Sequence, residues 1–423
     1  MGRGGFLQAG HAPTLFMAFL YFDVSFMTWV IFGPLANSIA PDLGLAPDRK
    51  YLLTAVPILG GAILRLVLGL LADRIGPRRT ALLGMGLTFL PLLLGWLWAD
   101  SFAELLLVGA LLGVAGASFA VALPLASRWY PPQFQGLVMG IAGAGNSGTA
   151  LATLFVPMLS KAYGWHAAFG IALVPLALTA VAFWILAKDA PTQPPPKPLK
   201  DYGRALVQLD AWWFCFFYFI TFGGFVGLAS ALNAFFTDQF ALDPVHAGYF
   251  TTACVIAGSF VRPIGGHLAD RVGGVRMLVG LFAGIGALLA AVATLPPLWT
   301  TATLLFCTMA LMGMGNGAVF QLVPLRFSSE IGVVTGVVGA AGGVGGFFLP
   351  TLLGMVKQSA GNFGPGFAAF GGLAFVAIGA LLFAARIWTW VGEGGRALGG
   401  APASIPATPA LTPVRAAVGD PAT

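Results

Sequence analysis

The sequence predicts an all-α integral membrane protein whose twelve transmembrane helices form two pseudo-symmetric six-helix halves. Three observations support this prediction. Of 423 residues, 58% are hydrophobic and only 9% are charged, whereas soluble domains carry about 25% charged residues. The apolar runs continue over about twenty residues, which is typical of membrane-spanning helices and not of barrel strands. One polar motif also occurs twice, at matching places in the two halves.

Six apolar segments precede a proline-rich basic stretch and six follow it. They lie at 13–39, 51–73, 79–98, 102–127, 134–160, 166–187, 209–237, 246–270, 276–296, 299–325, 333–357 and 365–390. We therefore expect an N-terminal six-helix bundle over 1–187 and a cytoplasmic linker over 188–208. A C-terminal six-helix bundle over 209–391 and a disordered cytoplasmic tail over 392–423 would follow.

The basic residues are distributed unevenly between the two predicted sides of the membrane. With the N-terminus in the cytoplasm, the predicted outer side carries only Arg49, Lys50, Lys161 and Lys357. The other basic residues outside the spans fall on the predicted inner side, as the positive-inside rule requires. The sequence thus predicts a multi-pass protein of the cell inner membrane with both termini cytoplasmic. The first apolar run is too long for a cleavable signal peptide.

The repeated motif reads AILRLVLGLLADRIGPRR at 62–79 and SFVRPIGGHLADRVGGVR at 259–276. Each copy places an arginine, Arg65 or Arg262, inside an apolar run, eight residues before the aspartate of LADR. Eight helical residues rise about 12 Å, so both arginines fall near the middle of a hydrocarbon core about 30 Å thick. The repeat extends further, because GASFAVALPL at 116–125 matches GAVFQLVPL at 317–325. The fifth span of each half also begins with a glycine-rich run.

Two buried cations at equal depth predict a bound anion between the halves. A guanidinium is always charged and offers forked N–H donors that suit a small planar anion. The alternative is pairing with backbone carbonyls or with an acid. Acids are scarce in the spans, because only Asp23 lies clearly inside one, and one acid cannot neutralise two separated cations.

No enzyme chemistry is indicated. The spans show no nucleophile–base pair, phosphate loop or dinucleotide fingerprint. Cys215, Cys254 and Cys307 form no C-x-x-C pair, so neither a disulfide framework nor a metal site is expected. We expect no cofactor and no nucleic-acid partner; the expected partners are a small inorganic anion and the lipid bilayer, and one chain suffices as a monomer.

The two LADR motifs and the twelve spans resemble the major facilitator superfamily. Within it, GIAGAGNSG at 140–148 and GAAGGVGG at 339–346 resemble the two signatures of the nitrate/nitrite porter family, although the second run contains no asparagine. By this resemblance Arg65 and Arg262 clamp the substrate from opposite sides. The segment YFITFGGF at 218–225 resembles span seven of the family, which implies that Tyr218 and Phe222 touch the anion, and Phe119 matches a phenylalanine of span four.

Other candidate residues come from the chemistry of the spans. Backbone without side chains at Gly143, Gly145, Gly342 and Gly343 would line a very small pocket, or else serve close helix packing. The amide of Asn146 would donate to the anion or join two helices. A cytoplasmic charge latch between helices is expected from Asp73, Arg74, Asp270 and Arg271.

The resulting expectation is secondary transport of nitrate and nitrite by alternating access, with exchange of one anion for the other. Two arginines would repel each other when the halves close without an anion, and this favours exchange. A nitrate/proton symport that uses Asp23 remains the alternative, because burial raises the affinity of a carboxylate for protons. Transport of another small anion and a non-transporting membrane sensor are the remaining readings.

Overall fold

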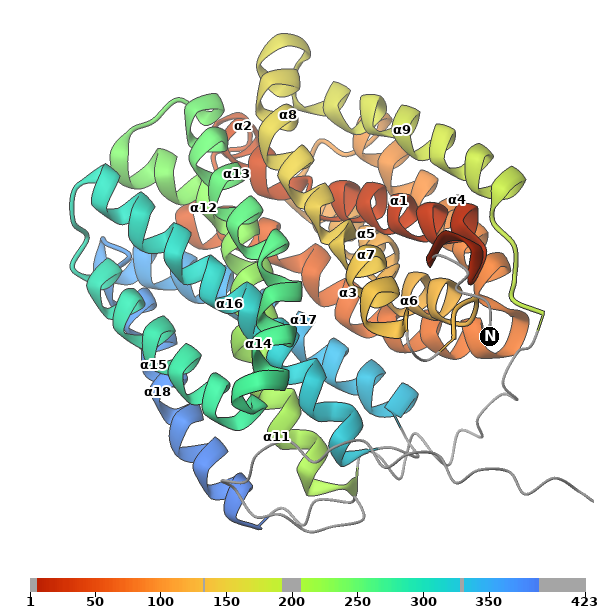
Figure 1. The fold of residues 1–423 in the computed structure, drawn as a ribbon. Coiled ribbons are helices and arrows are strands. Elements are labelled where there is room, and N and C mark those ends of the chain that lie inside the picture. The colour runs from red at the N-terminus through yellow and green to blue at the C-terminus, as the bar shows by residue number, and fades with distance from the viewer. Residues whose placement is uncertain (1–5, 132–133, 192–206, 328–330, 388–423) are drawn as a thin grey trace, which may run out of the picture.

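The computed structural model describes residues 6–131, 134–191, 207–327 and 331–387, and within these ranges it contains helices and no strand (Figure 1). The predicted tail over 392–423 and most of the predicted linker lie outside the described residues. The two groups of helices occupy different sides of the molecule, with the red-to-yellow helices on one side and the green-to-blue helices on the other.

The N-terminal group begins with a short 3₁₀ turn, η1, and several of its spans consist of two or three consecutive helical segments. Its elements are η1 (Phe6–Gln8), α1 (Ala12–Trp29), α2 (Phe32–Asp42), α3 (Pro47–Ile75), α4 (Pro77–Leu97), α5 (Phe102–Gly116), α6 (Phe119–Ser127), α7 (Gln135–Gly143), η3 (Ala144–Ser147), α8 (Gly148–Tyr163) and α9 (Trp165–Leu186).

The C-terminal group follows the same plan. Its elements are α11 (Leu209–Tyr218), the π-helical segment η4 (Phe219–Gly223), α12 (Gly224–Phe240), α13 (Pro244–Phe260), α14 (Arg262–Val272), α15 (Gly274–Ala293), α16 (Leu298–Arg326), α17 (Ile331–Ala360) and α18 (Gly364–Ile387).

The helices fall where the apolar segments predict them. Among the described residues, eleven helical segments are long and apolar enough to cross a membrane. The predicted segment 246–270 supplies a twelfth, which is divided into α13 and α14 at Val261. Pro263 explains the division, because proline has no N–H and its ring clashes with the preceding turn of a helix.

The repeated motif produces the same helix end in both groups. Gly76 ends α3 with φ of 89°, and Gly273 ends α14 with φ of 95°. A residue with a side chain rarely adopts these angles, so glycine is the natural helix terminator here. The sequence repeat therefore encodes a repeated backbone turn.

The two groups meet along α3 and α17, which pack side by side over much of their length. Glycines make this approach possible: a Cβ on Gly343 would lie 2.7 Å from the Cβ of Ala62, and one on Gly346 would lie 2.8 Å from Cγ2 of Ile58. Small residues let helix backbones come this close. This contact brings the middle of α3, with Arg65, against the C-terminal group.

Candidate functional site

The candidate site lies where several helices are interrupted. Phe119 begins α6 after a break between α5 and α6, and Asn146 lies in the 3₁₀ segment η3. Tyr218 ends α11 at the π-helical segment η4, and Arg262 begins α14. Local π and 3₁₀ segments in helices are frequent at functional positions. Helix breaks in transporters also place substrate sites near the midplane.

Arg65 is fully enclosed and joins the two groups of helices. Its side chain is 1% exposed. One terminal nitrogen donates to the carbonyl of Gly339 at 2.7 Å, and the other donates to the carbonyl of Gly116 at 3.0 Å. The Nε–H of Arg65 has no partner among the described residues. Pairing with backbone carbonyls, one of the two alternatives that the sequence left open, therefore uses only part of this guanidinium and leaves its Nε–H without a partner in the described part of the chain.

Arg262 has a different environment. It is half-buried, and its Nη1 group is enclosed without a hydrogen-bond partner in the described part of the chain. Its Cζ lies 5.5 Å from the ring centre of Phe119 and 5.9 Å from that of Phe320. No carboxylate of the described residues forms an ion pair with Arg65 or Arg262. Both cations are thus left without a counter-charge.

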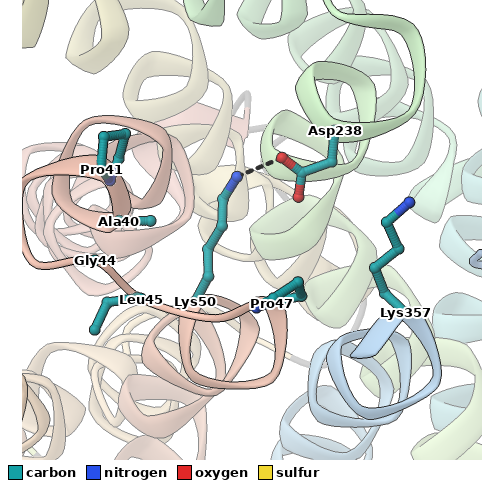
Figure 2. A pocket seen from close by; sticks show the side chains of 8 residues that line it. All are labelled: Ala40, Pro41, Gly44, Leu45, Pro47, Lys50, Asp238 and Lys357. Carbon is teal, nitrogen blue, oxygen red and sulfur yellow. Dashed lines mark hydrogen bonds and ion pairs between the residues drawn. The ribbon is translucent and has the colours of Figure 1, made fainter. Parts of the chain in front are cut away.

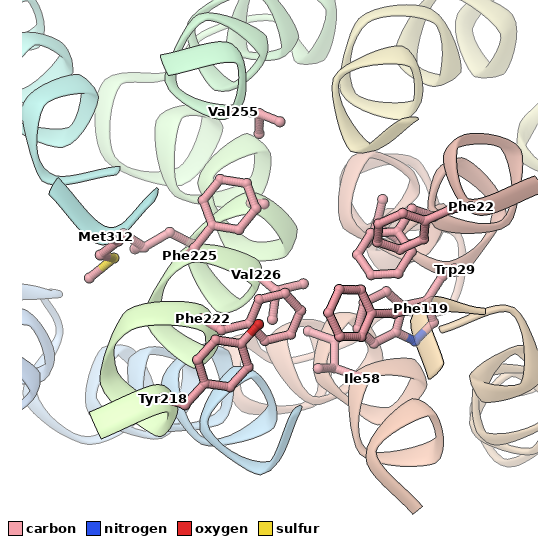
Figure 3. Packing of buried hydrophobic residues seen from close by; sticks show 14 of the residues in the cluster. Phe22, Trp29, Ile58, Phe119, Tyr218, Phe222, Phe225, Val226, Val255 and Met312 are labelled. Atoms are coloured by element: carbon pink, nitrogen blue, oxygen red, sulfur yellow. The ribbon is translucent and has the colours of Figure 1, made fainter. Parts of the chain in front are cut away.

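Aromatic rings from both groups surround the two guanidinium groups. The Cζ of Arg65 lies 5.4 Å from the ring centre of Phe119 and 5.3 Å from that of Phe222, within the range of a cation–π contact. Tyr218 stacks on Phe222 with ring centres 5.0 Å apart, and its buried hydroxyl group lies near the guanidinium of Arg262. Figure 3 shows Tyr218 and Phe222 reaching the site from one group and Phe119 from the other.

Phe320 on α16 belongs to this cluster, and the sequence interpretation missed it. Its ring lies 4.9 Å from the ring of Tyr218 and 6.3 Å from that of Phe119. The signal was present in the repeat, because GAVF at 317–320 matches GASF at 116–119. Phe320 is thus the counterpart of Phe119 in the second half.

Asn146 is fully buried on η3, and neither its oxygen nor its nitrogen has a hydrogen-bond partner among the described residues. This amide therefore makes no interhelical hydrogen bond within the described part of the chain. A Cβ on Gly143 would meet no atom within 4 Å, whereas one on Gly145 would lie 2.7 Å from the Phe22 ring. Gly143 faces open space, and Gly145 serves helix packing.

The glycines of α17 approach the site from the other group. A Cβ on Gly342 would lie 2.5 Å from the ring of Tyr218, and one on Gly339 would lie 3.2 Å from Cδ of Arg65. Gly343 packs against α3 as described above. The missing side chains therefore make room for the ring of Tyr218, the guanidinium of Arg65 and the α3 backbone.

Asp23 lies on α1 and is 6% exposed. Its carboxylate accepts a hydrogen bond of 2.6 Å from the hydroxyl of Ser147, the residue that follows Asn146. A Cβ on Gly148 would lie 1.7 Å from the backbone oxygen of Asp23. Asp23 therefore fixes the position of η3 against α1, and no arginine is paired with it among the described residues.

The predicted charge-latch residues lie at the ends of α3 and α14. Asp73 is half-buried and accepts a hydrogen bond of 2.8 Å from Arg128, which was not in the predicted set. Arg74, Asp270 and Arg271 are exposed and form no ion pair with any described residue. The structure therefore brings only Asp73 of the four into an interhelical ion pair.

The predicted outer end is closed by contacts that cross between the two groups. Lys50 of α3 pairs with Asp238 of α12 at 2.6 Å (Figure 2), and both line a cavity of about 480 Å³. The amide nitrogen of Asn37 donates to the side-chain oxygen of Asn233 at 2.6 Å. Lys161 pairs with Asp243 at 3.1 Å.

The chain resembles known carriers over most of its length. A family profile described as Major Facilitator Superfamily matches residues 17–350. Among solved structures, a bacterial homolog of the human lysosomal transporter Spinster, in an inward-facing and occupied conformation, superposes with a TM-score of 0.67. It is 17% identical, and the match covers 91% of this chain and 98% of that one. At this identity the likeness concerns the fold.

Relatives of higher identity were found among characterised and named proteins. A nitrite extrusion protein of Bacillus subtilis (strain 168) is 35% identical over 370 residues, which cover 86% of this chain and 91% of the relative. A probable nitrate/nitrite transporter, NarK2, of Mycobacterium tuberculosis is 37% identical, with coverage of 84% and 91%. A probable nitrate/nitrite antiporter, NarK1, of Thermus thermophilus is 32% identical, with coverage of 80% and 83%. The chain therefore belongs to the major facilitator superfamily and, within it, to the nitrate/nitrite porter family.

Proposed function

We propose that this protein carries nitrate and nitrite across the cell inner membrane by exchanging one anion for the other. The names of its relatives support this substrate class. The observation that carries the proposal is the pair of guanidinium groups, Arg65 and Arg262, over the shared ring of Phe119. Each keeps an enclosed N–H without a partner among the described residues.

A small planar anion satisfies the needs of this site. Hydrogen bonds between an arginine and an anion are charge-assisted and about twice as strong as neutral ones. The rings of Phe119, Phe222 and Phe320 lie against the two cations, and a Cβ on Gly143 would meet no atom within 4 Å. An anion of three or four atoms would supply the missing charge and accept the free donors.

Exchange follows from the repulsion between the arginines. As the halves rock about the site, each conversion between end states encloses both guanidinium groups. Without an anion two like charges would be enclosed together, which disfavours the conversion. The carrier would therefore return only when loaded.

Counterflow in proteoliposomes tests this proposal. Vesicles loaded with nitrite should take up labelled nitrate in the absence of a proton gradient, and uptake should stop when the internal nitrite is omitted. Uptake that ignores internal nitrite but follows an imposed pH gradient would exclude obligate exchange. Absence of nitrate entry under both conditions would exclude the proposed substrate.

A second candidate is nitrate/proton symport, and the bond between Asp23 and Ser147 favours it. Protonation of this carboxylate would change a contact next to Asn146 in the site. Asparagine in place of Asp23 keeps the shape of the side chain and its capacity for hydrogen bonds, but its amide cannot bind a proton. Unchanged dependence of uptake on a pH gradient in D23N would exclude Asp23 as the proton carrier.

We further propose that the described conformation faces the cytoplasm. The positive-inside rule places the Lys50–Asp238 contact on the outer side, and this end is closed by contacts between the halves. The linker over 188–208 would then join the halves at the open side. A monomer supplies both halves of the site, and Asp73 with Arg128 would act as a charge latch within the N-terminal half.

A further inference from the structure

Asn316 on α16 is a buried amide without a role so far. It is 1% exposed, and neither its oxygen nor its nitrogen has a hydrogen-bond partner among the described residues. An amide in such a place is costly unless it is hydrogen-bonded. An apolar residue would fit the interior of α16 at lower cost, so the amide needs an explanation.

Its neighbours on α16 show where the Asn316 side chain points. A Cβ on Gly315 would lie 2.5 Å from Cγ2 of Thr221 on η4, and one on Gly317 would lie 2.4 Å from the carbonyl oxygen of Arg262. Successive helical residues are rotated by about 100°. Asn316 therefore projects between η4 and the start of α14, the two segments that carry part of the site.

The next turn of α16 gives the same direction. Phe320 follows Asn316 by four residues and lies on the same helix face. Its ring contacts the ring of Tyr218 and lies under the guanidinium of Arg262. The Asn316 amide is therefore one helical turn from the cation–aromatic cluster.

Other polar groups in this region also lack partners. On η4, α13 and α14, the buried atoms without a hydrogen-bond partner among the described residues include Thr221 Oγ1, Ser259 Oγ and Arg262 Nη1. Buried polar groups in proteins normally have partners. An acceptor that carries negative charge would suit the free guanidinium donor of Arg262.

The second half lacks an asparagine in its glycine run, where the first half has Asn146. Asn316 reaches the region of the site from α16 instead. Each half then contributes an arginine on its second span, a phenylalanine on its fourth span, and a buried asparagine whose amide has no hydrogen-bond partner among the described residues.

We propose that Asn316 donates its side-chain N–H to the transported anion and is the counterpart of Asn146 in the second half. This inference rests on the proposed function. The inference makes Asn316 a residue that binds the substrate and sets its affinity. The positions of Arg65 and Arg262 do not depend on Asn316.

The test replaces Asn316 with leucine, which has a similar volume and cannot donate a hydrogen bond. Thermal unfolding of the purified full chain is followed while sodium nitrate replaces sodium gluconate at constant ionic strength. A second variant, N316S, keeps a small polar group in case leucine does not fit. The control is T308V on the same helix, since Thr308 is equally buried but bonds to the carbonyl of Leu304.

For N316L we expect the nitrate concentration that gives half-maximal stabilisation to rise about tenfold. A change of this size corresponds to the loss of one good hydrogen bond to a charged group. Without nitrate the unfolding temperature of N316L should equal or exceed that of wild type, because an unsatisfied buried group has been removed. N316S should show a smaller rise in the half-maximal concentration, and T308V should bind nitrate like wild type.

A structural role for Asn316 predicts the opposite pattern. If N316L unfolds at a lower temperature without nitrate and keeps the wild-type nitrate response, the inference is overturned, and the same holds if N316S responds like wild type. If the wild-type protein is stabilised by neither nitrate nor nitrite, the proposed function fails and the inference with it. A responsive wild type together with an equally responsive N316L overturns the inference alone.

Discussion

Arg65 and Arg262 occupy equivalent places in the two repeats, yet their surroundings differ. Arg65 is enclosed and bonded to one carbonyl from each half, at Gly116 and Gly339. Arg262 is half-buried, and its Nη1 has no partner among the described residues. From this difference we propose that Arg65 binds the anion and also holds the halves together, whereas Arg262 only binds the anion.

The largest expected effect comes from replacing Arg65 with alanine. Two buried carbonyls would lose their donors, at a cost of about 1–3 kcal/mol each, and the anion would lose a charged partner. We expect counterflow to fall by about 100-fold, because hydrogen bonds to charged groups contribute about 1.5–3 kcal/mol and about 1.4 kcal/mol corresponds to a factor of ten. The unfolding temperature without nitrate should also fall. An R65A variant with wild-type thermal stability would contradict the tying role.

Replacing Arg262 with alanine should separate the two roles. Counterflow should again fall by about 100-fold, since a charge-assisted pair is lost, but the unfolding temperature without nitrate should stay at the wild-type value. R262K is the matched variant: it keeps the charge without the fork, so part of the activity should remain. If the unfolding temperature without nitrate falls as much in R262A as in R65A, the two arginines do not differ in their structural role.

A substitution at Gly339 tests the hydrogen bond between Arg65 and the Gly339 carbonyl, which has no counterpart at Arg262 among the described residues. A Cβ at this position would lie 3.2 Å from Cδ of Arg65, whereas one at Gly336 would meet no atom within 4 Å. We expect G339A to displace the guanidinium and to raise the nitrate KM by about tenfold, since about 1.4 kcal/mol of lost binding has this effect. G336A on the same helix should leave the KM unchanged. Equal KM values in the two variants would show that Arg65 tolerates the displacement.

The ion pair between Lys50 and Asp238 should hold the two halves together at the predicted outer end, as Arg65 does within the site. D238N weakens the pair between Asp238 and Lys50, which is largely buried, so the outer end should open more often. The test uses a C307S background, which removes the exposed cysteine, together with L45C beside the cavity. Adding D238N to this background should make the L45C thiol react a few times faster with an impermeant maleimide. D100N is the control, because Asp100 pairs with His166 within one half. Unchanged labelling in D238N would show that other contacts hold the outer end closed.

The smallest expected effect concerns Asp243, which pairs with Lys161 across the halves. Burial acts to raise the pKa of Asp243, but hydrogen bonds from Lys161 and from the Val245 N–H outweigh it and hold the pKa below its usual value. A lowered pKa stabilises the folded protein above the ordinary carboxyl pKa, and this contribution disappears as the pH falls through the lowered value. The unfolding temperature of D243N should therefore lie slightly below wild type at pH 7, and the difference should persist at mildly acidic pH and shrink only as the pH falls below the ordinary carboxyl pKa of 3.8. A constant difference would show that the charge of Asp243 does not matter.

The repeat shows how far sequence reasoning reached at the site. The two arginines, Tyr218, Phe222 and Phe119 were predicted, and the structure brings their side chains together. Phe320 was missed although its segment was recognised as a repeat of the Phe119 segment. The π-helical segment η4 was also missed, because nothing in the apolar pattern of span seven distinguishes it from a regular helix.

The sequence by itself determined that the chain spans a membrane, where its helices lie, and that an arginine occupies the same place in two similar sequence motifs. Hydropathy and motif spacing are local properties, so they can be read without the fold. Only the tertiary structure decided that Arg65 is bonded across the halves, whereas Nη1 of Arg262 has no partner in the described part of the chain. It also decided that Asp73 pairs with Arg128 and that Asn316 is buried with no hydrogen-bond partner among the described residues. These outcomes depend on which helix faces meet, because hydrogen bonds between helices form only when packing brings donor and acceptor within about 3 Å.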